Sequence, residues 1–199
     1  MKKYILYLIL FSNLVFSQIS KKKEPFFNFE PKLKVSLIAP FNFGNNHFAK
    51  DYRNNLGFGI NVSLLRIKKY SFSLGYDFKR YTSQNKEIIG DFGFINTSST
   101  YFQTEYIINY NKEIQIHPFV GYSSVISNFK DEEKTTLAKQ IGNEIRVGSA
   151  IDYKLNKVFS AFFSFHYAYY FNDLNASTDN KKYFGKSNMV QFSVGLEIN

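Results

Sequence analysis

The chain has 199 residues, no cysteine and a formal net charge of +9. The absence of cysteine excludes a disulfide scaffold, a thiolate metal site, a cysteine nucleophile and a lipid anchor on an N-terminal cysteine. Aromatic residues make up 19% of the chain although its mean hydropathy is −0.27, a combination expected of strands with one polar and one apolar face.

The N-terminal residues have the features of a secretory signal peptide. Lys2 and Lys3 form a basic start, and the apolar run Tyr4–Phe16 is shorter than the roughly 20 residues of a membrane-spanning helix. Val15 and Ser17 place small residues at positions −3 and −1 of a cut before residue 18. We therefore expect a signal peptide over residues 1–17, a periplasmic lead-in over 18–31 and one domain over 32–199. An uncleaved N-terminal anchor is the alternative.

Eight alternating stretches follow, with bulky apolar residues at every second position and polar or small residues between them. The predicted strands are Leu33–Phe43, Leu56–Ile67, Tyr70–Tyr81, Thr100–Tyr110, Ile114–Ile126, Asn143–Lys154, Val158–Phe171 and Asn188–Asn199. The long connections between them are Gly44–Asn55, Thr82–Ser98, Ser127–Gly142 and Asn172–Ser187, and the short ones are Lys68–Lys69, Asn111–Glu113 and Leu155–Lys157. An even number of strands with alternating long and short connections is typical of an up-and-down outer-membrane barrel.

The composition of the polar faces distinguishes a membrane barrel from a soluble one. A soluble lipocalin-like barrel or sandwich would carry Lys, Glu and Thr on its polar face, but here this face is rich in Gly, Ser and Ala. Small residues suit the narrow lumen of an eight-stranded barrel, which leaves room only for packed side chains. We therefore predict an all-β fold, an eight-stranded antiparallel up-and-down transmembrane β-barrel.

This pattern resembles the OmpA-like and OmpX-like small outer-membrane barrels, and in size and pattern also the PorT-like barrels. The resemblance covers residues 32–199 and includes the PFVGY stretch at Pro118–Tyr122 and the closing strand QFSVGLEIN at Gln191–Asn199. It implies a place in the outer membrane. Barrels of this kind usually close on a strand that ends in an aromatic residue, whereas this chain ends in Leu196-Glu197-Ile198-Asn199.

The basic excess lies mainly in the short turns, which hold one acidic residue, Glu113, against Arg66, Lys68, Lys69, Lys112, Lys154 and Lys157. We expect these side chains to contact anionic outer-membrane lipids, although they could also simply stay solvated. An exported chain without a concentrated basic helix does not suggest nucleic acid as a partner. We expect a monomer.

Charged residues also fall on the inward face of the predicted strands. They are Lys34, Asp77, Lys79, Glu105, Glu144, Arg146, Asp152 and Glu197. Because unpaired charges in a narrow lumen are costly, we expect ion-pair networks that plug the barrel, with Arg146 held between Glu105 and Glu144. The alternative is a proton or ion path.

The three histidines His47, His117 and His166 do not have the spacing of metal ligands, and neither a metal nor a cofactor is predicted. Ser164 precedes His166 by two residues on the same strand face. Some outer-membrane barrels are lipid A deacylases or acyltransferases that use His and Ser. The deacylases carry them two apart in the opposite order, and Ala168 occupies that position here. A lumen histidine with ordinary hydrogen bonds is the other interpretation.

The sequence predicts a non-catalytic role in envelope structure, or in surface interaction through the long loops. One alternative is a lipid-modifying enzyme that uses His166. Another is an accessory barrel of a secretion or transport assembly, with a protein partner at the loops or the periplasmic rim.

Overall fold

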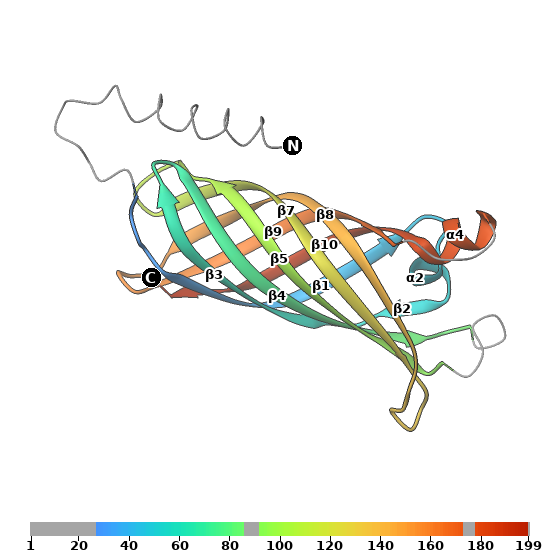
Figure 1. Ribbon diagram of the computed structural model, residues 1–199. Helices are drawn as coiled ribbons and strands as arrows, with labels where there is room; N and C mark the ends of the chain where they lie inside the picture. Colours follow the sequence, from blue (N-terminus) through green and yellow to red (C-terminus); the bar gives the residue numbers. More distant parts are fainter. Residues whose placement is uncertain (1–26, 86–91, 173–177, 199) are drawn as a thin grey trace, which may run out of the picture.

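A computed structural model of the protein describes residues 27–85, 92–172 and 178–198 (Figure 1). The predicted signal peptide and most of the predicted lead-in lie outside the described residues. Of the lead-in, Asn28 forms an isolated antiparallel bridge with Arg66. The backbone N–H and C=O of each residue exchange hydrogen bonds of 2.9 Å with the other, so this segment is attached to the end of the barrel.

Eight long strands form a closed antiparallel barrel. They are β1 (Lys32–Phe43), β3 (Gly57–Ile67), β4 (Tyr70–Ser83), β5 (Phe94–Tyr106), β7 (Ile114–Lys130), β8 (Thr136–Lys154), β9 (Phe159–Phe171) and β10 (Lys186–Ile198). Neighbours run in the order β4-β3-β1-β10-β9-β8-β7-β5, and pairing of β4 with β5 closes the ring. This closed ring of eight antiparallel strands confirms the predicted fold class. Because the ring is closed, it leaves no long unpaired strand edge in the bilayer.

Four short elements complete the fold: α2 (His47–Lys50), β2 (Tyr52–Asn54), β6 (Ile108–Asn109) and α4 (Thr178–Gly185). The helices α2 and α4 lie together at one end of the barrel, and the described start of β1 and end of β10 lie at the other (Figure 1). We call these the loop end and the turn end. None of the helices in the described ranges is long and apolar enough to cross a membrane.

Two of the predicted long connections are shorter than expected because strands extend into them. Strands β4 and β5 both reach into Thr82–Ser98, and most of Ser127–Gly142 is a hairpin of β7 and β8. Beyond the bilayer a strand needs no apolar face, so its polar sequence is indistinguishable from that of a loop. The hydroxyl oxygens of Thr97 and Ser127, for example, lie 3.0 Å apart in this extension.

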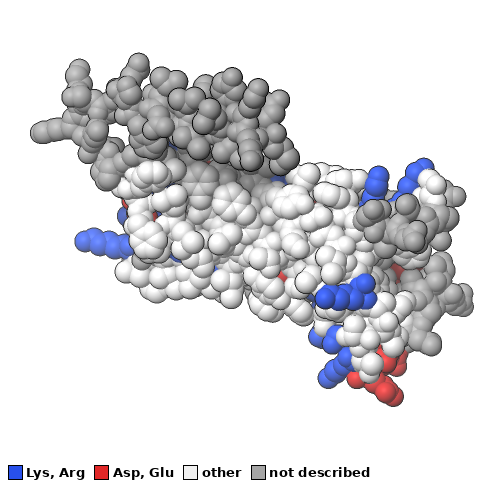
Figure 2. All heavy atoms as spheres, in the orientation of Figure 1, with Lys and Arg blue, Asp and Glu red and all other residues white. Residues whose placement is uncertain are grey.

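The alternation of the sequence separates an apolar outer face from a small-residue inner face. Leu74 and Val194 are 51% and 58% exposed, whereas the adjacent Ser73 and Ser193 are 1% and 8% exposed. Figure 2 shows that charged side chains on the visible face gather mostly towards the ends of the barrel, with a largely uncharged band between them. This band has the character of a lipid-facing surface.

Arginine in place of Val194, near the middle of β10, tests this assignment. It should destabilise the barrel by roughly 2–4 kcal/mol, because a guanidinium near the bilayer midplane is poorly solvated. Reversible urea unfolding in lipid vesicles measures the change.

Leu155→Arg is the matched control, because Leu155 is a 54% exposed apolar residue at the turn end. Its cost should be about 0–1 kcal/mol, as expected near a membrane interface. Equal costs at the two positions would contradict the assignment of the outer face to lipid.

Candidate functional site

The eight charged residues predicted on the inward face are all buried in the barrel interior, with exposed fractions between 2% and 6%. They come from β1, β4, β5, β8 and β10 and form two clusters. The turn-side cluster consists of Lys32, Lys34, Glu105, His117, Asp152 and Glu197. The loop-side cluster consists of Asp77, Lys79, Glu144 and Arg146.

Lys34 is the centre of the turn-side cluster. Its Nζ lies 3.0 Å from Asp152 Oδ2, 3.3 Å from Glu197 Oε2 and 4.0 Å from Glu105 Oε2. These carboxylates come from β8, β10 and β5, so one ammonium connects strands on different sides of the barrel. Lys32 Nζ donates a further hydrogen bond of 2.9 Å to Glu197 Oε1. A buried lysine is tolerated here because several carboxylates compensate it.

His117 belongs to the same cluster, although it is missing from the inward charged residues predicted from the sequence. Its Nδ1 lies 3.1 Å from Glu105 Oε2, and its Nε2 lies 3.4 Å from Asp152 Oδ2 without hydrogen-bond alignment. The alternation of β7 contains a signal for this position, since His117 shares the inward face with Phe119 and Gly121.

Arg146 is the centre of the loop-side cluster. Its Nη2 and Nε donate to Glu144 Oε1 over 2.6 and 3.1 Å, and its Nη1 donates to Asp77 Oδ2 over 3.1 Å. Gln191 Nε2 donates to the same Asp77 oxygen over 3.3 Å, and Lys79 Nζ lies 3.8 Å from Glu144 Oε2. The guanidinium therefore links β8 to β4, two strands that do not pair.

The predicted contact between Arg146 and Glu105 is wrong. Through the strand pairings, Arg146 is opposite Gly121, which is opposite Gln103. Glu105 lies two residues further towards the turn end, where its Oε2 meets Lys34 and His117 instead. The register of the ladder, which alternation alone does not give, thus assigns the two glutamates to different clusters.

Two glycines make room for the Arg146 side chain and for the Tyr101 ring against which it packs. A Cβ on Gly121 would lie 2.9 Å from Arg146 Cγ, closer than real Cβ contacts allow. The Tyr101 ring lies over Gly75, where a Cβ would overlap it, and the Arg146 guanidinium carbon lies 3.9 Å from the centre of this ring. Glycine, which weakens a strand, is retained here because larger residues would displace Tyr101 and Arg146.

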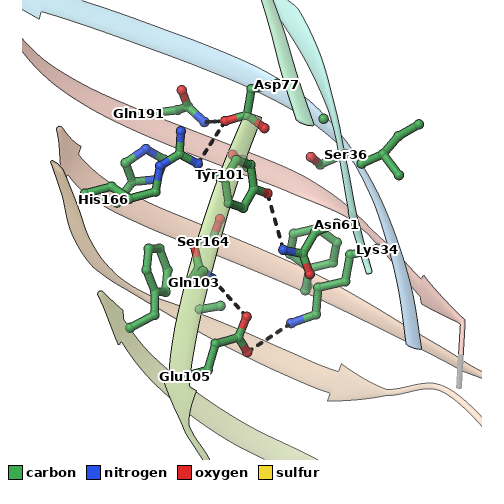
Figure 3. Close-up of a pocket in the computed structure, with 17 residues that line it drawn as sticks. Lys34, Ser36, Asn61, Asp77, Tyr101, Gln103, Glu105, Ser164, His166 and Gln191 are labelled. Carbon is green, nitrogen blue, oxygen red and sulfur yellow. Dashed lines mark hydrogen bonds and ion pairs between the residues drawn. The ribbon is translucent and has the colours of Figure 1, made fainter. Parts of the chain in front are cut away.

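A small cavity of about 50 Å³ separates the two clusters (Figure 3). Asp77 and Gln191 lie on one side of it, and Lys34 and Glu105 on the other. A second cavity of about 20 Å³ lies on the loop side, lined by Lys79 and Glu144 among others. Both can hold only a few waters, since one water needs roughly 10–15 Å³. A wider space of about 580 Å³ opens at the turn end.

His166 and Ser164, the residues of the enzyme alternative, both line the 50 Å³ cavity. His166 is 4% exposed, and its Nε2 has no hydrogen-bond partner within the described ranges. The imidazole packs edge-on against the Phe119 ring at 5.8 Å between centroids. Both side chains therefore point into the barrel interior. Among the residues that the structure describes, no group of three His, Asp or Glu is arranged to hold a metal ion.

An aromatic cluster covers the loop end of the interior. It consists of Phe48, Tyr52, Tyr81, Ile95, Val125 and Tyr170, with Phe92 and Phe129 packed against it. The ring centroid of Phe48, in α2, lies 5.1 Å from that of Tyr81 and 6.2 Å from that of Tyr170. Phe48 also lines the cavity beside Lys79 and Glu144, so the apolar cluster lies directly over the loop-side ion pairs. From the sequence, Phe48 and Tyr52 are expected only as part of the long connection Gly44–Asn55.

Replacement of Arg146 by alanine tests the contribution of the loop-side cluster. It would leave Asp77 and Glu144 as neighbouring buried carboxylates without their shared cation. Loss of one partner of a buried pair costs about 3–5 kcal/mol. Arg66→Ala is the control, because Arg66 pairs with Glu30 at the surface, where an ion pair contributes about 0–1 kcal/mol.

Urea unfolding of both variants and the wild type in the same lipid gives the two differences in unfolding free energy. A cost for Arg146→Ala no larger than that for Arg66→Ala would show that the buried pairs do not stabilise the barrel.

Comparison with known proteins supports the fold. No family model and no curated protein matches the chain. Among solved structures, the chain is similar to Neisserial surface protein A, with 11% identity, a TM-score of 0.59 and coverage of 84% of this chain and 96% of that one. It is also similar to a major outer membrane protein from Thermus thermophilus, with 14% identity, a TM-score of 0.56 and coverage of 85% and 99%. The chain thus has the fold of small outer-membrane β-barrels, while a relation to PorT-like barrels stays a prediction.

Proposed function

We propose that the protein is a non-catalytic integral barrel of the outer membrane whose lumen is closed to solutes. In this proposal its role is structural or lies in surface interaction through the loop end. A cleaved signal peptide over residues 1–17 would bring it to the outer membrane, with the turn end in the periplasm. The fold and the apolar outer face support the location.

The observation that carries this proposal is the pair of ion-pair clusters across the lumen. In the loop-side cluster, the cations Lys79 and Arg146 face the anions Asp77 and Glu144. An ion that crossed this layer would have to separate contacts of 2.6–3.8 Å, without bulk water to replace them. The turn-side cluster would be a second such barrier.

The aromatic cluster supports closure at the loop end. Phe48, Tyr81 and Tyr170 are 5%, 2% and 6% exposed, and they line the cavity above the loop-side cluster. Water in that cavity of about 20 Å³ would have no wide outlet past these rings. A solute would therefore meet an apolar layer before it met the charged ones.

Surface interaction would involve the hairpin of β7 and β8 that extends past the barrel. Leu137 and Ile141, on the extended part of β8, are 50% and 60% exposed. The connection between the two strands spans residues 131–135 and includes Lys134 with a positive φ of 71°. This hairpin presents apolar and charged side chains beyond the barrel wall, which suits contact with another macromolecule.

The remaining partner predictions are part of the same proposal. The lysines of the short turns would contact anionic lipid headgroups, and the barrel would function as a monomer. For the enzyme alternative, a lipid substrate would have to reach His166 through the barrel wall, and this is why we favour a non-catalytic role. A partner at the loops or the rim would be compatible with either a solitary barrel or part of an assembly.

Single-channel recording in a planar bilayer tests closure. Wild-type protein should insert without a steady conductance, because neither cluster leaves a continuous water path. Arg146→Ala is the informative comparison, since it removes one of the two cations of the loop-side layer but leaves Lys79 and the turn-side cluster intact, and it should stay closed as well. Steady, large conductance of the wild type would overturn the proposal.

A further inference from the structure

Tyr183 on α4 makes two polar contacts that join α4 to α2. The Tyr183 carbonyl oxygen lies 3.2 Å from His47 Nδ1, and the Tyr183 hydroxyl donates a hydrogen bond of 2.8 Å to Asp51 Oδ2. His47 opens α2 and Asp51 caps its C-terminus, so both ends of this short helix contact α4. Gln140 Nε2 adds a bond of 2.9 Å to the Phe184 carbonyl.

The surroundings of His47 are aromatic. Its ring centroid lies 4.1 Å from that of Phe48, 5.4 Å from that of Phe184 and 6.2 Å from that of Phe129. The imidazole is 1% exposed, and its Nε2 has no hydrogen-bond partner in the described part of the chain. This nitrogen can remain there without a proton, but an imidazolium has two N–H donors and a charge that the aromatic rings cannot solvate.

The titratable side chains around His47 are Asp51 on α2, Tyr52 on β2 and Tyr183 on α4. Burial and the neighbouring Asp51 raise the pKa of Tyr183 to about 12, and burial raises that of Tyr52. Both hydroxyls therefore keep their protons at any pH relevant here. Asp51 accepts its hydrogen bond from Tyr183. Within the described residues, the contact that favours the imidazolium is the one with the Tyr183 carbonyl.

Burial lowers the pKa of the His47 imidazole from 6.5 to about 4, and the contact with the Tyr183 carbonyl offsets only part of this effect. The closed arrangement therefore binds the His47 proton more weakly than an open, solvated one. Well above pH 6.5 the His47 imidazole is deprotonated in both arrangements, and the closed one keeps its full stability relative to the open one. As the pH falls from 6.5 towards 4, the open arrangement gains a proton and the closed one loses its advantage.

We propose that α2 and α4 form a lid over the loop end of the barrel that closes at neutral pH and is released by protonation of His47. Release separates Tyr183 from His47 and Asp51 and exposes the rings of Phe48 and Tyr52. The eight long strands stay paired, because their ladders do not include the lid. An acidic medium would thereby uncover an aromatic patch at the end of the barrel that faces away from the turns.

Distance measurement between two spin labels tests the lid. Because the chain has no cysteine, Lys50→Cys on α2 and Lys182→Cys on α4 can be labelled selectively, and both lysines are exposed. Double electron–electron resonance in lipid nanodiscs is recorded at pH 7.5, 5 and 4, with circular dichroism to verify the barrel. With a His47 pKa of 6.5 in the open lid and about 4 in the closed lid, the ratio of closed to open molecules should fall roughly 30-fold between pH 7.5 and 5. A longer, broader distance distribution should therefore appear.

His47→Phe is the matched control, because phenylalanine keeps a ring in the aromatic surroundings and cannot be protonated. Its distance distribution should stay short at every pH. Tyr183→Phe removes the hydrogen bond to Asp51 and so weakens the closed lid. In the doubly labelled protein this variant should open at a higher pH than the protein with Tyr183, and it should make an opening that is otherwise too rare to detect measurable.

Two outcomes would overturn the proposal. One is a pH-dependent opening of His47→Phe equal to that of the parent, which would place the titrating group elsewhere. The other is a short, unchanged distance at pH 4 in both the parent and Tyr183→Phe while the barrel remains folded.

Discussion

The ion pairs of Lys34 and Arg146 are the interactions on which the rest of the structure depends. Each cation binds a carboxylate on a strand that does not pair with its own, Asp152 for Lys34 and Asp77 for Arg146, so each connects separate walls of the barrel. An eight-stranded barrel has no space for bulk water around such charges. Every inward charge must therefore have its partner at the same level, and the small inward residues leave the volume that these side chains need.

Much of the fold can be read from the sequence because a membrane barrel repeats one simple rule. Leu74 faces out and Ser73 faces in because neighbours on a strand point to opposite sides, and this holds whatever the partner strand. Strand ends beyond the bilayer follow no such rule. The extension of β8 before Ile141, residues 136–140, carries polar residues on both faces, and its sequence could equally be that of a loop.

The interior was only partly predictable for a different reason. Burial of Glu105 and Arg146 follows from alternation within one strand, but which of them meet depends on the register between strands, which alternation does not contain. The inward position of His117 follows from the alternation of β7, but its contacts with Glu105 and Asp152 again depend on the register. The lid over the loop end depends on contacts between His47 and Tyr183, residues 136 positions apart, and no local pattern predicts such a contact.

The two ends of the barrel follow from this interior. The proposed closure of the lumen would leave the protein its outer face for lipid and its two ends for other molecules, and the two ends differ in chemistry. The turn end carries short basic connections. The loop end carries an aromatic cluster under two short helices, next to a hairpin that projects from the barrel. Ion pairs in the middle and two short helices at one end support the proposed role of a membrane barrel that presents a surface.

Double-mutant cycles within and between the two clusters test most directly whether the buried charges form two energetically separate clusters. Lys34→Met and Asp152→Asn, which lie in one cluster, should show a coupling energy of at least about 1 kcal/mol in lipid unfolding experiments. Lys34→Met and Asp77→Asn, which lie in different clusters, should be additive within about 0.5 kcal/mol. Additivity within the turn-side cluster, or a coupling between clusters as large as that within one, would contradict the division of the lumen into two separate ion-pair clusters.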